Sequence, residues 1–239
     1  MTAAQLKSAG PPPLTRADIA ARLARPRDPL RQARSDLHTA AQLLHASDLK
    51  PYETGGSPGL NVAFATPLPA DAPRMAAAVL VPLVEYGDGF RLVFTQRNPD
   101  LKAHAGQISF PGGRMEDSDI DAESAALREA QEEVDLDPRR VEILGRLDPY
   151  RTVTGFDITP VVGAIRPPLD LTPDPQEVAE IFEVPLAFVL DAANHQRHSR
   201  TGPTGVVRAY YAMPYRDRYI WGATAGMLMN LYEVLTAGT

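Results

Sequence analysis

The chain has 239 residues, a formal net charge of −6 and 44% hydrophobic residues. These values are typical of a protein with one large domain and its own core, and the negative charge argues against non-specific binding to nucleic acid or anionic membranes. The absence of cysteine excludes disulfides, thiolate nucleophiles and cysteine-ligated zinc. Because no apolar signal core or run of about 18 apolar residues occurs, we expect a soluble, cytoplasmic protein without a membrane partner.

The first seventy residues differ in composition from the rest of the chain. Prolines flank two short segments that predict helices, at residues 15–25 and 35–46, with Thr15 and Ser35 as their N-caps. Residues 50–73 are rich in Pro, Gly, Ser and Ala, which is typical of extended connecting chain. We therefore expect an N-terminal helical and extended appendage at residues 1–70, with room for a homodimer contact, and a main domain at residues 71–239.

The main domain alternates between strand and helix patterns. An apolar run at residues 76–84 predicts a buried strand, and a Gly-Asp-Gly turn joins it to a partner strand at residues 90–95. Further elements follow in chain order: a helix at 122–134, strands at 141–147, 159–165 and 181–184, and a helix at 222–235. This order indicates an α/β (α+β) fold in which a mixed sheet lies between helices, with an N-terminal helical extension.

Three glutamates stand out on the helix expected at residues 122–134. Glu129, Glu132 and Glu133 are spaced i, i+3 and i+4, so the helix places them on one face, and apolar residues gather on the other. One interpretation is a solvated acidic surface, in which Arg128 pairs with Glu132. The other is a site for a hard divalent cation, which prefers oxygen ligands and removes the repulsion between the carboxylates. The helix alone does not separate these interpretations.

The residues before the helix favour the second interpretation. Paired glycines, Gly112 and Gly113, let the main chain approach an ion or a phosphate closely. Together with the helix they resemble the Nudix box, G-x5-E-x7-R-E-U-x-E-E-x-G-U, in which U is apolar. The matching residues are Gly113, Asp119, Arg128, Glu129, Glu132, Glu133 and Leu136. Asp119 stands in place of the first glutamate, with eight residues rather than seven before Arg128, and Asp135 replaces the glycine at the helix end.

This resemblance implies a Nudix fold and a pyrophosphohydrolase that depends on Mg²⁺ or Mn²⁺. The implied metal ligands are Glu129, Glu132 and Glu133, with the carbonyl of Gly113 as an addition. Glu132 and Glu133 are also implied to be catalytic residues, and Arg128 is expected to orient a glutamate. The resemblance leaves the general base open between a box glutamate and an acid from a later loop. Glu177 is a candidate general base, although a surface glutamate explains it equally well.

A second stretch, upstream of the box, resembles the motif of the coenzyme A pyrophosphatase branch, L-L-T-x-R-[SA]-x3-R-x3-G-x3-F-P-G-G. It runs from Leu92 to Gly113 with all spacings preserved and with Lys102 in place of the second arginine. Residues 91–115 carry four basic side chains against one acid, and residues 116–136 carry nine acids against one arginine. The resemblance implies that Arg97, Lys102 and Arg114 bind substrate, and that coenzyme A is cleaved to 3′,5′-ADP and 4′-phosphopantetheine.

Two other functions stay open at this point. The chain could hydrolyse another nucleoside diphosphate derivative, such as ADP-ribose or a dinucleotide, or it could be a non-catalytic nucleotide sensor. Several residues outside the motifs are weaker candidates for substrate contacts. They are His104, a basic loop expected at residues 195–200, and the aromatic residues Tyr210, Tyr211 and Trp221. For the aromatic residues, packing in the core is the alternative to stacking on adenine.

Overall fold

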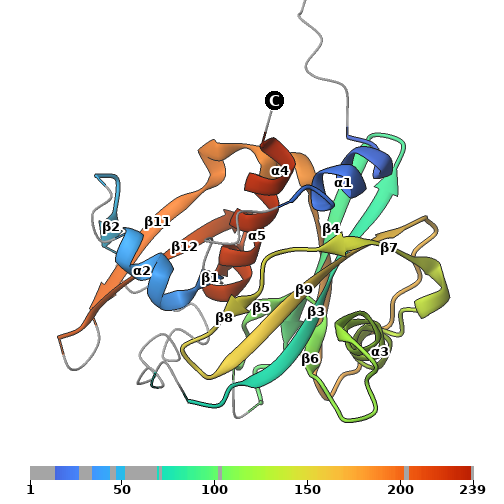
Figure 1. Cartoon of the computed structure of the whole chain (residues 1–239), viewed down its shortest axis with the longest axis horizontal. Coiled ribbons are helices and arrows are strands. Elements are labelled where there is room, and N and C mark those ends of the chain that lie inside the picture. The colour runs from blue at the N-terminus through green and yellow to red at the C-terminus, as the bar shows by residue number, and fades with distance from the viewer. Residues whose placement is uncertain are drawn as a thin grey trace, which may run out of the picture.

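A computed structural model describes residues 14–26, 34–43, 47–51, 69, 72–101, 104–201 and 205–237. Two β-sheets and the helices packed on them make up this part of the chain (Figure 1). Lys102, an expected substrate-binding residue, lies outside the described residues.

The larger sheet has nine strands and carries the main core. Six of them follow in this order: β1 (Arg34–Ser35), β8 (Tyr150–Arg151), β9 (Phe156–Ile165), β3 (Met75–Tyr86), β4 (Gly89–Arg97) and β10 (Val178–Pro185). The other three are β5 (Ile108–Ser109), which pairs with β4, β6 (Gly112–Arg114), which pairs with β3, and β7 (Val141–Arg146), which pairs with β9. Because β3 runs parallel to β9 and antiparallel to β4, the sheet is mixed, as expected.

Helices cover both faces of this sheet, and strand β3 shows why. Ala78 and Leu80 pack under helix α3 (Ala122–Val134), whereas Val79, Val81 and Leu83 belong to the core on the opposite face. That second core includes residues of helices α1 (Arg16–Leu23) and α5 (Gly222–Thr236). The period-two alternation of strand side chains therefore divides one apolar run between two helical layers. The expected arrangement of a mixed sheet between helices is confirmed.

The second sheet was not expected from the sequence. It has four strands in the order β13 (Arg218–Trp221), β12 (Val207–Tyr215), β11 (Gln196–Thr201) and β2 (Lys50–Pro51). The expectation of a basic loop at residues 195–200 is wrong, because this segment is strand β11, which pairs antiparallel with β12 and parallel with β2. This strand has a polar sequence and therefore lacks the apolar pattern from which a strand is predicted. Its backbone pairing with β12 and β2 holds it in place.

The described N-terminal elements join both sheets and the core. Helix α1 begins after Thr15, which forms the expected cap together with Asp18, and Ile19 and Leu23 are buried. Helix α2 (Asp36–Leu43) contacts β12 and α5, and Ser35, expected as its cap, is the last residue of β1. The division of the chain at residue 70 stays a prediction. Within the described residues, no helix is long and apolar enough to cross a membrane.

Helix α4 (Leu186–Leu190) and two short 3₁₀ helices, Pro138–Arg140 and Ala192–Asn194, complete the described elements.

Candidate active site

Helix α3 has well-defined ends, which fix the positions of its acidic residues. At its start, the Asp121 carboxylate accepts a hydrogen bond from the Ser124 backbone N–H (2.8 Å), and the Ser124 hydroxyl accepts one from the Asp121 N–H (3.0 Å). At its end, Asp135 adopts the left-handed conformation with φ of 55°. Aspartate is one of the few residues besides glycine that tolerate this conformation, which explains how Asp135 replaces the expected glycine.

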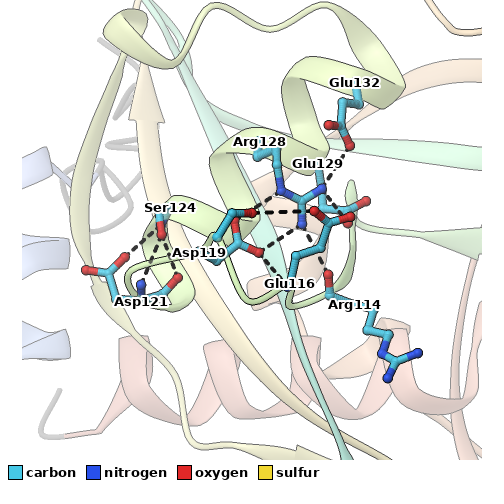
Figure 2. Close-up of polar contacts among 9 residues, drawn as sticks. Arg114, Glu116, Asp119, Asp121, Ser124, Arg128, Glu129 and Glu132 are labelled. Atoms are coloured by element: carbon cyan, nitrogen blue, oxygen red, sulfur yellow. Dashed lines mark hydrogen bonds and ion pairs between the residues drawn. The ribbon is translucent and has the colours of Figure 1, made fainter.

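Arg128 is the centre of a hydrogen-bond network between α3 and the loop before it (Figure 2). Its guanidinium donates to both carboxylate oxygens of Asp119 (3.1 and 3.0 Å) and to the backbone carbonyl of Arg114 (3.1 Å). It also donates to Glu129 Oε1 (3.0 Å) and Glu132 Oε2 (2.9 Å). A planar guanidinium suits such a two-pronged contact, so one side chain ties the loop to two carboxylates.

This network fixes the orientation of the Asp119 side chain. Its carboxylate accepts two hydrogen bonds from Arg128 and a third from the Glu116 backbone N–H (2.8 Å), and its side chain is buried. The hydrogen bonds from Arg128, and then the one from Glu116, hold the pKa of Asp119 below its usual range. Asp119 therefore anchors the loop and faces Arg128, which accounts for an aspartate in place of the first box glutamate.

The two glycines of β6 lie directly against the carboxylates. The Gly112 backbone N–H donates to Glu133 Oε2 (3.3 Å). At Gly113, a Cβ atom would stand 2.5 Å from Glu129 Oε2, so only glycine leaves room for this carboxylate. Gly112 has φ of 152° and packs against the backbone of β3, where a Cβ would lie 2.5 Å from Val79 Cα. Both glycines are required by close contact, Gly113 by a carboxylate and Gly112 by the neighbouring strand.

Glu133 is the most buried acid of the helix, with 4% of its surface exposed. Burial raises its pKa to about 7, against the opposing effects of the Gly112 N–H and the Arg97 guanidinium, 3.6 Å away. Burial also raises the pKa of Glu129, although Arg128 acts in the opposite direction. The negative charge of Glu177 contributes to both increases, so this exposed residue lies within electrostatic reach of the helix.

A divalent cation fits the chemistry of these donors. The acids are all oxygen ligands, and a nearby positive ion would offset the burial and the repulsion that raise the pKa values of Glu129 and Glu133. Within the described ranges, no three acidic or imidazole side chains converge as a ready-made site. The reason is geometric: Arg128 holds Glu129 and Glu132, while Glu133 faces Gly112 and Arg97. Binding a metal therefore requires rotation of these side chains.

A cavity of about 480 Å³ lies next to Arg97 and strand β6, which separate it from the acidic residues of helix α3. Arg97, Gly112, Gly113 and Arg114 line it, so two of the three expected substrate-binding residues border both the cavity and the acidic site. Its size is typical of cavities that bind small organic ligands. The structure thus brings two basic residues of the upstream segment, Arg97 and Arg114, close to the acidic segment.

Residues far from the motifs complete the cavity wall. They come from helix α2, strands β8, β9 and β12, and helix α5, and none of the α2 residues was expected from the sequence. Tyr210 and Trp221 lie on the wall with their rings edge to face at 5.4 Å. His104 is there as well, and its Nδ1 is 2.7 Å from Gln107 Oε1. These residues are distant from the motifs in sequence and meet at the cavity only in the folded protein.

Comparison with known proteins agrees with this geometry. Residues 73–203 match the family model described as NUDIX domain. The chain is 43% identical over 158 residues to an uncharacterized Nudix hydrolase, NudL, of Klebsiella pneumoniae subsp. pneumoniae, covering 65% of this chain and 80% of that one. It is 42% identical over 157 residues to the NudL of Escherichia coli K12, with the same coverage.

Among solved structures, a Nudix hydrolase from M. smegmatis, RenU, aligns with a TM-score of 0.41 and 23% identity, over 48% of this chain and 73% of that one. The family model covers more than half of the chain, and the curated relatives are matched over most of their length. The chain therefore belongs to the Nudix hydrolase family.

Proposed function

We propose that this protein hydrolyses the diphosphate of coenzyme A in the presence of Mg²⁺ or Mn²⁺. Membership of the Nudix family supports hydrolysis of a nucleoside diphosphate derivative, and the motif at residues 92–113 favours coenzyme A among them. The observation that carries the proposal is the position of Arg97. Its guanidinium lies 3.6 Å from the Glu133 carboxylate and also lines a cavity of ligand size, so it can hold a phosphate between the two.

In this mechanism, Glu129, Glu132 and Glu133 would hold the cation, with the carbonyl of Gly113 as an additional ligand. When bound, the cation neutralises phosphate oxygens and favours ionisation of a water molecule. A water oxygen attacks one phosphorus, and the bond from that phosphorus to the bridging oxygen breaks. Each product then carries one phosphate where the diphosphate was, which gives 3′,5′-ADP and 4′-phosphopantetheine.

The basic residues and Arg128 have separate tasks. Arg97 and Arg114 would bind the diphosphate from the cavity side, where charge-assisted hydrogen bonds orient it towards the acids. Lys102 is proposed for the same task from the sequence motif alone. Arg128 is a positioning residue, because its hydrogen bonds fix Glu129 and Glu132 and it faces the loop rather than the cavity.

Glu177 is our candidate for the general base that takes the proton from the attacking water. It is exposed and close enough to influence the pKa values of Glu129 and Glu133. The Asn98 backbone N–H donates to its carbonyl (2.8 Å), so the loop after β4 and the segment before β10 are held together near the acids.

A substrate panel tests the proposal. Purified protein is incubated with Mg²⁺ or Mn²⁺ and with coenzyme A, ADP-ribose, NADH or nucleoside triphosphates, and products are identified by mass. We expect coenzyme A to be cleaved most efficiently, into the two products named above. Cleavage of another compound while coenzyme A survives would refute the substrate assignment. Binding of nucleotides without any cleavage would favour a sensor.

A matched pair of variants tests the acidic site. Glu133→Gln should lower turnover by orders of magnitude, because it removes a ligand charge at a buried position. Glu123→Gln makes the same change on the same helix at an acid that pairs with Arg146, away from the site, and should keep near-normal turnover. Thermal unfolding of both variants checks that they are folded. Wild-type turnover in Glu133→Gln would remove this residue from the ligand set.

A further inference from the structure

The cavity lies on the face of the main sheet opposite to helix α3. Ala77 and Val79 of β3 line the cavity, whereas Ala78 between them packs under α3. Strand β6 and Arg97 border both the cavity and the acidic side chains. A substrate whose diphosphate lies beside Glu133 is therefore placed to extend past Arg97 into the cavity.

Charged groups occupy only parts of the cavity wall. Arg97 and Arg114 are at the border with α3, and Asp36 and Arg208 lie on the walls formed by α2 and β12. Burial raises the pKa of Asp36, and the hydrogen bonds and Arg208 oppose this increase. The Asp36 oxygens accept hydrogen bonds from the Tyr150 hydroxyl (2.7 Å) and the Val153 N–H (2.8 Å).

Next to these charges, the wall combines apolar side chains with hydroxyl groups. Thr152 and Thr154 are examples, with their hydroxyl oxygens 2.9 Å apart, and Phe156, Ile158 and Met227 supply apolar surface. Such a wall accepts an uncharged chain that carries amides and hydroxyls, because each polar group can find a partner without a compensating ion. A phosphate on the inner part of a ligand would meet Asp36 as well as Arg208, whose charge Asp36 already offsets, and would lose its hydration.

We propose that this cavity is the subsite for the pantetheine arm of the substrate, and that helix α2 forms the wall that limits it. The proposal rests on the proposed function. The nucleoside half of coenzyme A carries an additional phosphate, whereas the arm is an uncharged chain of amides beyond the diphosphate. Thr39 and Ala40 of α2 line the cavity, and α2 lies beside β12 (Figure 1). The N-terminal segment thereby takes part in substrate selection.

The test fills the cavity and measures the binding of each product half. Ala40→Leu adds bulk at the α2 wall, and Ala223→Leu does so on α5, in case α2 does not tolerate the change. Ala21→Leu is the matched control, because Ala21 is exposed on α1, a helix of the same length as α2. Binding of 4′-phosphopantetheine and of 3′,5′-ADP is measured by calorimetry, together with the KM for coenzyme A. Thermal unfolding confirms that the variants fold.

We expect both cavity variants to weaken 4′-phosphopantetheine binding and to raise the KM by about tenfold or more, since overpacking excludes the ligand. The affinity for 3′,5′-ADP should change less than about twofold, as should both affinities in Ala21→Leu. Weaker binding of 3′,5′-ADP alone would place the nucleoside in the cavity and overturn the proposal. So would unchanged binding of both halves, or no binding of 4′-phosphopantetheine to the wild type. If the wild type does not cleave coenzyme A, the proposed function fails. If the wild type cleaves coenzyme A and the cavity variants bind both product halves as the wild type does, only the assignment of the cavity to the pantetheine arm is refuted.

Discussion

The exchange of Gly113 for alanine tests the position of the Glu129 carboxylate, a proposed metal ligand, separately from the stability of the fold. The backbone of Gly113 is not in the left-handed region, so alanine can adopt its conformation. The new Cβ would stand 2.5 Å from Glu129 Oε2 and 2.6 Å from its carboxylate carbon. Ordinary contacts begin at 3.4 Å, so the carboxylate must retreat by about 0.9 Å. Glu129 is the end of a flexible side chain and can make this movement.

The movement should cost activity rather than stability. It disturbs the 3.0 Å hydrogen bond from Arg128 to Glu129, and a displacement near 1 Å in a reacting group can lower turnover about 100-fold. We expect Gly113→Ala to lower kcat by about this factor under saturating Mg²⁺. The change in unfolding free energy should stay within about 1 kcal/mol. Steady-state kinetics and urea unfolding measure the two effects on the same preparation.

Two other glycines serve as controls for this experiment. At Gly112 the added Cβ meets the backbone of Ala78 and Val79 at 2.5 Å, and φ is 152°, so Gly112→Ala should be severely destabilised. At Gly87, in the β3–β4 turn, nothing lies within 4 Å, so Gly87→Ala should resemble the wild type. Near-wild-type kcat in Gly113→Ala would refute the reasoning, because it would show that Glu129 acts from a position away from the glycine.

Two more predictions concern the same network. Because the pKa of Glu133 is raised to about 7 in the folded protein, the metal-free wild type should lose up to about 3 kcal/mol of unfolding free energy relative to Glu133→Gln as the pH rises from 4.5 to 7. Urea unfolding across this range would show parallel curves for the two proteins if Glu133 were ionised throughout. Arg128→Lys should lower the unfolding free energy by about 1–3 kcal/mol, because lysine cannot donate to both oxygens of Asp119 and to the Arg114 carbonyl at once. Unfolding together with kinetics tests this, and an unchanged midpoint would show that the network is dispensable.

Local signals in the sequence determined much of the main domain. The helix predicted at residues 122–134 has these bounds in the structure, because Asp121 caps its start and its apolar spacing fits one buried face. The turn at Gly87-Asp88-Gly89 placed the β3–β4 hairpin, and Thr15 with Asp18 marked the start of α1. Capping and turn formation depend on residues that are close to one another in the sequence, so both can be predicted from the sequence alone.

Tertiary structure decided what depends on contacts between distant segments. The sheet of strands β11 to β13 was not predicted. Strand β11 has a polar sequence without an apolar period, and its pairing with β12 and β2 holds it in place. The cavity likewise joins α2 to β12 and α5 across most of the chain.

Helix α3 also has features that the sequence determines and features that depend on the fold. The spacing of Glu129, Glu132 and Glu133 puts them on one face of the helix. The same spacing occurs on a solvated acidic surface and in a site for a divalent cation. The structure buries Glu133 against the backbone of Gly112, whereas Glu132 is exposed and pairs with Arg128. Desolvation raises the pKa of a carboxyl only when other segments exclude water from it, and those segments meet only in the folded protein.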